Sequence, residues 1–190
     1  GECIVKHPEQ ATADAQVSVI QSLISQGVDS IAIAANDENA LQAALEEAMD
    51  AGIKVSCLDS KVNADSRMTF VNQAGTEEIG TTLMDAVYDI TGGEGQWAIL
   101  SATSQATNQN AWIEAMKSAM EADEKYSKLE LVEVAYGDDE PQKSTDQTQA
   151  LLSKYPKLKL ICAPTTVGIN AAAKVLQDEK SSVKLTGLGL

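Results

Sequence analysis

Residues 101–112 carry only uncharged side chains, in the order SATSQATNQNAW, and follow the apolar run of residues 97–100 directly. Hydroxyl and carboxamide groups both donate and accept hydrogen bonds, as the hydroxyls of a sugar do. The whole chain has a net charge of −14, so a loop that only had to be soluble would have no reason to avoid charge. The segment therefore indicates a binding site for an uncharged, hydroxyl-rich molecule.

Polar residues also follow other apolar runs that we expect to be strands. These segments are residues 34–37, 59–61, 136–139 and 164–166. In open parallel sheets, ligands bind beyond the carboxyl ends of the strands. Asp59 follows a buried run with no obvious helix to cap, so we expect its carboxylate to bind ligand through charge-assisted hydrogen bonds, about twice as strong as neutral ones.

Several of these residues have a structural explanation as well. Asn36 and Asp37 are suited to capping the helix that follows them. Residues 138–140 fit a solvated acidic loop, and residues 164–166 fit a helix entry. One amide among residues 108–110 is expected to cap its own helix, which leaves the other amides as candidates for ligand binding.

The apolar periodicity switches repeatedly between that of strands and that of helices. We expect strands at 2–5, 30–34, 55–58, 69–72, 97–100, 129–134, 158–162 and 183–185. We expect helices at 12–26, about 37–51, 76–90, 109–122, 144–153 and 167–177. This alternation predicts right-handed βαβ crossovers and parallel sheets covered on both faces. The fold class is α/β, and the glycine-rich segment 91–95 is interpreted as the boundary between two similar lobes, 1–93 and 94–190.

Composition excludes several classes of function. Asp and Glu total 28 against 14 Lys and Arg, which argues against nucleic-acid binding. No run approaches the 18 or so apolar residues of a membrane span, and the start GECIVKHPEQ lacks the regions of a signal peptide. An enzyme is disfavoured because no GxSxG elbow, metal-ligand cluster or phosphate loop occurs, and the single histidine, His7, is expected in a loop.

The cysteines Cys3, Cys57 and Cys162 show no CxxC spacing, and each lies in an expected strand. We expect them to be buried thiols that pack as small apolar groups. No cofactor, metal ion or disulfide framework is expected.

Several motifs occur in a characteristic order along nearly the whole chain. They are QGVDSIAIAAND, AGIKV followed by Asp59, FVNQ, WAILSATSQATNQNAW and LICAPTTVGINAAAKVL. Together they resemble the type I periplasmic sugar-binding proteins of ABC transporters, in particular the subgroup of rhamnose-binding and autoinducer-2-binding proteins. The resemblance implies an extracytoplasmic, monomeric protein that captures a small neutral sugar between two closing lobes and delivers it to a membrane permease.

The resemblance also implies the ligand contacts. They are Asp59, Asn108, Gln109, Pro164 and Thr166. The autoinducer-2 type typically has Asp at the first position of the pair, so Asn108 favours a deoxysugar such as rhamnose. Several loops must converge on the ligand, because micromolar binding needs about −8 kcal/mol and one net hydrogen bond supplies about 0.5–1.5 kcal/mol.

The resemblance leads to one further expectation and leaves two alternative functions open. Family members have a strand and helix before the first expected strand and continue beyond residue 190, so the pocket within this chain is expected to be incomplete. The alternatives are an autoinducer-2 receptor and the effector domain of a sugar-responsive transcription repressor, which shares the fold and would carry a helix-turn-helix upstream.

Overall fold

The fold is described from a computed structural model that covers residues 1–189. Its helices are α1 (Ala13–Gln26), α2 (Gln42–Asp50), α3 (Thr76–Thr91), α4 (Thr107–Ala122), α5 (Pro141–Lys154) and α6 (Thr166–Asp178), with short 3-10 turns η1 (Ala64–Ser66) and η2 (Glu124–Tyr126). Its strands are β1 (Ser30–Ile33), β2 (Lys54–Leu58), β3 (Thr69–Val71), β4 (Gly95–Ser101), β5 (Leu129–Tyr136), β6 (Leu158–Ala163) and β7 (Lys184–Gly187). The predicted α/β alternation is confirmed, and no helix among these residues is long and apolar enough to span a membrane.

The strands form two parallel sheets, and the chain divides into two compact units that each contain one of them. Unit 1 comprises Gly1–Ala74 with Gln105–Asn108, and unit 2 comprises Gly75–Ser104 with the described residues from Gln109 onward. The predicted boundary, at residue 93, lies after α3. The structure assigns α3 to unit 2, because Leu83, Met84 and Val87 of this helix are buried in the core of that unit.

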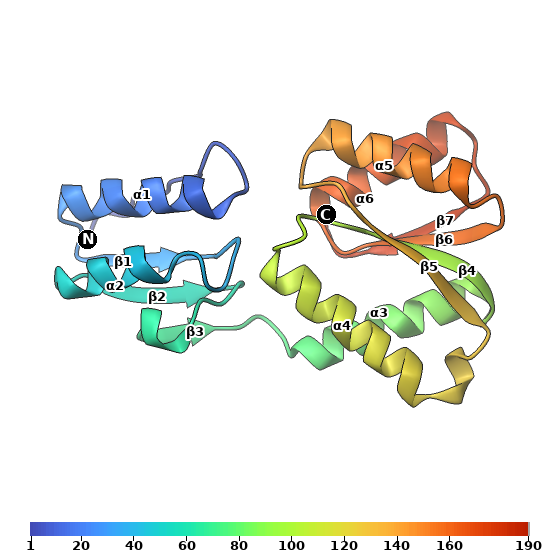
Figure 1. Cartoon of the computed structure of the whole chain (residues 1–190), viewed down its shortest axis with the longest axis horizontal. Coiled ribbons are helices and arrows are strands. Elements are labelled where there is room, and N and C mark those ends of the chain that lie inside the picture. Colours follow the sequence, from blue (N-terminus) through green and yellow to red (C-terminus); the bar gives the residue numbers. More distant parts are fainter. Residues whose placement is uncertain (190) are drawn as a thin grey trace. The chain divides into compact units, whose positions relative to one another are not determined.

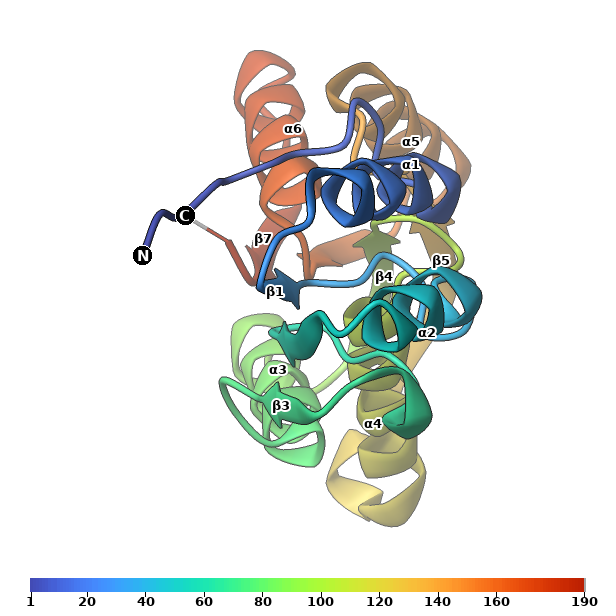
Figure 2. The same ribbon diagram turned by 90° about the vertical axis from the view of Figure 1, so that its left-hand side faces the viewer.

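In unit 1 the strand order is β1-β2-β3, and α1 and α2 both cover the same face of the sheet (Figure 2). The helix α1 begins where the Thr12 side chain accepts the Ala15 N–H and ends at Gly27, whose φ of 66° is in the left-handed region. Alternate residues of the strands, such as Ile31 and Val55, are buried against the helices.

The opposite face of this sheet carries exposed side chains. They are Ser30, Ala32, Lys54, Leu58, Thr69 and Val71. The expectation that both faces of each sheet are covered is therefore wrong for unit 1 within the described residues, because α1 and α2 lie on the same side.

In unit 2 the strand order is β5-β4-β6-β7, and helices cover both faces (Figure 1). The β4 residues Trp97 and Ile99 are buried in a core shared with α3 and α4. The alternate residues Ala98 and Leu100 are buried in a core shared with α5 and α6. This is the doubly wound arrangement that the sequence predicted, with the carboxyl ends of β4, β5 and β6 side by side.

The strand expected at residues 2–5 does not form. The segment is exposed, with Val5 72% exposed, and it pairs with none of the three strands β1, β2 and β3 that make up the sheet of unit 1. Cys3 is consequently exposed rather than buried, whereas Cys57 and Cys162 are buried as expected.

Candidate ligand-binding site

Asp59 lies at the carboxyl end of β2 and presents an exposed carboxylate. Its φ is 59°, a left-handed conformation that Asp tolerates better than most residues. Its N–H donates to the carbonyl oxygen of Val71 at the end of β3 (3.1 Å), so the turn is held against the neighbouring strand. The sheet therefore fixes the position of the carboxylate.

Asn108 is the second predicted residue that the structure brings to this place within unit 1. Its Nδ2 lies 3.3 Å from both the carboxylate Oδ1 and the carbonyl oxygen of Asp59. A carboxamide that donates to an anion leaves its own oxygen free to accept. Asp59 and Asn108 thus form a compact donor–acceptor pair.

Gln73 belongs to the same cluster, although it is not among the predicted ligand contacts. Its Nε2 donates to Asp59 Oδ1 at 2.7 Å, and the residue is exposed, two positions after the end of β3. The available signal was its position after a strand, the same feature that singled out Asp59.

In unit 2 the structure brings Gln109 and Pro164 together. Gln109 Nε2 donates to the carbonyl oxygen of Pro164 at 3.3 Å. Pro164 is buried after β6, and Thr166 is exposed as the first residue of α6. The predicted residues therefore form two groups, one in each unit, joined along the chain by the peptide bond between Asn108 and Gln109.

The residues for which the sequence also suggested a capping role make different hydrogen bonds. Asp37 Oδ1 accepts the N–H groups of Asn39 and Ala40 (2.8 Å each) and so caps the turn before α2. Asn36 is held through its own N–H, which donates to Gln16 Oε1 at 2.8 Å. The amide Asn110 donates to the Ser104 carbonyl oxygen at 2.9 Å and so holds the loop that leads into α4.

The acidic loop at residues 138–140 has specific partners. Asp138 forms an ion pair with Lys143, and Asp139 accepts a hydrogen bond from the Thr165 hydroxyl. The loop is solvated as expected, with Glu140 exposed, but two of its aspartates also have specific partners.

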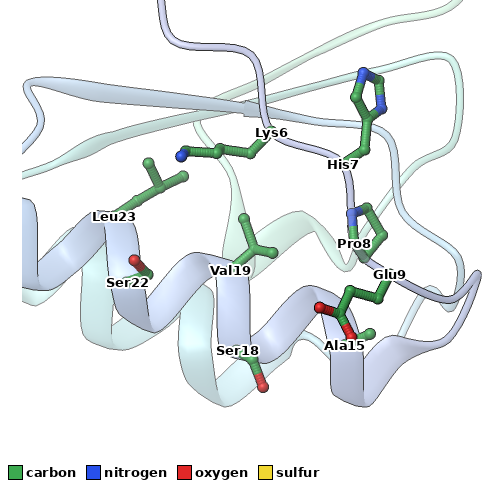
Figure 3. Close-up of a pocket in the computed structure, with 9 residues that line it drawn as sticks. All are labelled: Lys6, His7, Pro8, Glu9, Ala15, Ser18, Val19, Ser22 and Leu23. Atoms are coloured by element: carbon green, nitrogen blue, oxygen red, sulfur yellow. The ribbon is translucent and has the colours of Figure 1, made fainter.

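A hollow of about 420 Å³ lies in unit 1 between residues 6–9 and one side of α1 (Figure 3). It contains none of the predicted ligand contacts. Each of its two hydroxyls already makes one hydrogen bond along α1, since Ser18 donates to the Asp14 carbonyl oxygen and Ser22 accepts from Gln26. The His7 ring is exposed and points away from the helix in Figure 3, which fits the predicted loop position.

The carboxylates with a shifted pKa lie at ion pairs elsewhere in unit 2. The Tyr126 hydroxyl, followed by the Lys125 ammonium group, lowers the pKa of Asp85. The Lys154 ammonium group, followed by the Tyr155 hydroxyl, lowers the pKa of Glu133. Among the described residues, no group of three or more His, Cys, Asp or Glu side chains could hold a metal ion. The candidate residues thus provide hydrogen-bond donors and acceptors with one carboxylate, which suits a neutral polyol.

A family model described as a periplasmic binding protein domain matches residues 1–190. The chain is 61% identical to an ABC transporter solute-binding protein from Clostridium phytofermentas whose crystal structure contains L-rhamnose, with a TM-score of 0.97, covering 100% of this chain and 60% of that one. It is 26% identical over 166 residues to the D-ribose/D-allose-binding protein of Pseudomonas aeruginosa, which covers 82% of this chain and 49% of that protein.

A third relative, LsrB from Clostridium saccharobutylicum in complex with AI-2, is 24% identical with a TM-score of 0.89, covering 95% of this chain and 59% of that one. At this identity the likeness concerns the fold alone. The chain spans about half to three fifths of the length of these relatives.

Proposed function

The chain belongs to the periplasmic binding protein family, and from that premise we propose that it is part of the solute-binding protein of an ABC sugar importer. We propose a small neutral sugar of the rhamnose type as its ligand. The observation that carries this proposal is the 61% identity, over the whole chain, to a solute-binding protein with bound L-rhamnose.

The chemistry of the candidate residues supports a neutral ligand. Around Asp59, the amides of Gln73 and Asn108 already donate to the one carboxylate. Sugar hydroxyls can replace or extend such bonds because they donate and accept in the same way.

The family consists of solute-binding proteins rather than enzymes, and those of ABC transporters work outside the cytoplasm with a membrane permease. For this protein we propose the same location and the same kind of partner. We further propose that it acts as a monomer, without catalysis, metal ion or nucleic acid.

The test is calorimetric titration of the full-length protein with L-rhamnose. Asp59→Ala and Asn108→Ala should each weaken binding by about 1.5–3 kcal/mol, the scale of hydrogen bonds to charged or buried groups. This corresponds to a roughly 10- to 150-fold rise in Kd. Asp50→Ala is the matched control, because it removes the same charge from an exposed position at the end of α2.

If both site variants keep Kd within twofold of the parent, the proposed site is wrong. Autoinducer-2 is the second ligand to titrate, because the predicted difference between this chain and the autoinducer-2-binding proteins is the amide of Asn108 in place of an aspartate. If the protein binds autoinducer-2 more tightly than L-rhamnose, the proposed role in sugar import is wrong and the role of an autoinducer-2 receptor takes its place.

A further inference from the structure

The loop after β5 crosses the carboxyl end of β4 and reaches the loop after β6. In the strand order β5-β4-β6, β4 lies between the other two. The Gly137 N–H donates to the Ser101 carbonyl oxygen (2.9 Å), and the Asp138 N–H donates to that of Ala102 (3.1 Å). The next residue, Asp139, accepts a hydrogen bond from the Thr165 hydroxyl. Three strand exits are therefore tied together on one side of unit 2.

The backbone of this loop has a left-handed conformation that neighbouring groups must stabilise. Asp138 and Asp139 have φ values of 54° and 53°, so two consecutive non-glycine residues are left-handed. Such conformations are costly, persist only where neighbouring groups hold them, and cluster at functional sites. Each aspartate here has its own partner, Lys143 for Asp138 and Thr165 for Asp139.

Thr165 stands between Pro164 and Thr166, the two contacts expected from this loop, and is itself only 7% exposed. Its methyl group packs closely over Gly168, where a side chain would meet it at 2.7 Å. On the other side, Gln109 donates to the Pro164 carbonyl oxygen. The loop is therefore held by Gln109 from α4 and by Asp139 from the β5 exit.

We propose that Asp139 is a positioning residue for sugar binding: through the Thr165 hydroxyl it fixes the backbone of residues 164–166 in the geometry that contacts the ligand. This inference rests on the proposed function, in which Pro164 and Thr166 touch the sugar. It gives the acidic loop a role at the site without direct contact between Asp139 and ligand.

The experiment is a double-variant cycle in the full-length protein, with the Kd for L-rhamnose measured by titration and stability measured separately by urea unfolding. Asp139→Ala removes the acceptor, and Thr165→Val removes the donor while keeping the methyl that packs on Gly168. Each should raise Kd about five- to twentyfold, and the double variant should bind no more weakly than the weaker single.

Conservative variants separate positioning from a general loss of stability. Asp139→Asn keeps an acceptor oxygen and Thr165→Ser keeps the hydroxyl, so both should bind within about threefold of the parent. The matched control is Lys143→Ala, which removes the partner of the adjacent left-handed residue, Asp138, and should leave Kd within twofold.

Two results would overturn the inference while leaving the proposed function intact. One is that Asp139→Ala and Thr165→Val lower the urea midpoint but keep Kd within twofold. The other is that their effects on Kd multiply in the double variant, which would mean that the two residues act independently. A parent protein that binds no sugar at all would instead overturn the proposed function itself, and the inference with it.

Discussion

Replacing Gly80 with alanine tests the close approach between α3 and α4, two helices that bury side chains in the same core of unit 2. Gly80 is buried in the second turn of α3, and a Cβ there would lie 2.4 Å from the Ala115 Cβ. It would also lie 3.0 Å from the Ala115 carbonyl carbon and the Met116 nitrogen. Two of these three obstacles are backbone atoms, so no change of side-chain rotamer can remove the clash.

The magnitude follows from two opposing terms. Alanine is favoured over glycine in a helix interior by about 0.5–1 kcal/mol. Carbon atoms in contact lie about 3.5–4.0 Å apart, so α3 would have to move away from α4 by about 1–1.5 Å. Overpacking of this kind costs about 1–3 kcal/mol, so we expect Gly80→Ala to destabilise unit 2 by about 1 kcal/mol net.

Tryptophan fluorescence during urea unfolding is the appropriate assay. The chain has two tryptophans, Trp97 and Trp112, and both are buried in unit 2, so the signal reports the unit that contains the contact. In a thermal scan, about 1 kcal/mol corresponds to a fall in Tm of roughly 2–4 °C.

The companion variant is Gly80→Ala combined with Ala115→Gly, which moves the methyl group from one helix to the other. It should be more stable than the sum of the two single changes predicts, because the close approach is restored. An increase in stability for Gly80→Ala alone would refute the reasoning, since it would mean that helix propensity dominates and that the helices separate freely.

Two further predictions concern ionisation and thiol access. The Tyr126 hydroxyl and the Lys125 ammonium group lower the pKa of Asp85 in the folded protein below its unfolded value of 3.8. The ionised carboxylate therefore stabilises the fold at pH values above 3.8. This stabilisation is lost as the pH falls through the lower pKa of the folded state. Asp85→Asn should therefore flatten the decline of the urea midpoint below about pH 4; a decline as steep as the parent's would contradict this assignment. For the thiols, burial raises the pKa of Cys162 to about 12, whereas Cys3 is exposed. An aromatic disulfide reagent should therefore label Cys3 in the native protein and reach Cys162 only after unfolding. Peptide mass spectrometry identifies the labelled cysteine. Rapid native labelling of Cys162 would show that its burial is not maintained.

The elements of the fold were predictable where local signals and packing agree. α1, for example, shows its start at Thr12 and its stop at Gly27 in the sequence, and both are realised. The segment 2–5 has a strand pattern but no pairing partner among the described strands, and pairing is a non-local property that no local pattern contains. Local patterns therefore predicted the elements better than their pairing.

The boundary between the units was misread for a similar reason. Gly92 and Gly93 have φ values of 74° and 78°, which close the end of α3 and turn the chain into β4. Glycines of this kind serve a turn within one unit as readily as a linker between two. The chain instead changes unit at Ala74, ahead of α3, where the composition gives no comparable signal.

The positions of the candidate site residues were predictable, but their partners were not. Asp59 and Pro164 could be placed because ligands collect at the carboxyl ends of parallel strands. The bonds from Gln73 to Asp59 and from Thr165 to Asp139 join segments 14 and 26 residues apart in the chain. Their existence depends on strand order and loop conformation, which the sequence pattern does not specify.

The pairing of Asn108 with Asp59 has a consequence for the choice of ligand. The Asn108 Nδ2 lies 3.3 Å from the Asp59 carboxylate, so an aspartate at position 108 would bring two carboxylates into hydrogen-bonding distance. Two like charges at that separation disfavour each other's ionisation and call for a proton or a positively charged partner. With the amide of Asn108, the pair with Asp59 needs no additional proton or cation. The two side chains can therefore exchange their hydrogen bond for hydrogen bonds to a neutral ligand. The amide at this one position therefore suits an uncharged ligand, such as the sugar proposed above, for a reason that lies in the charge balance around Asp59.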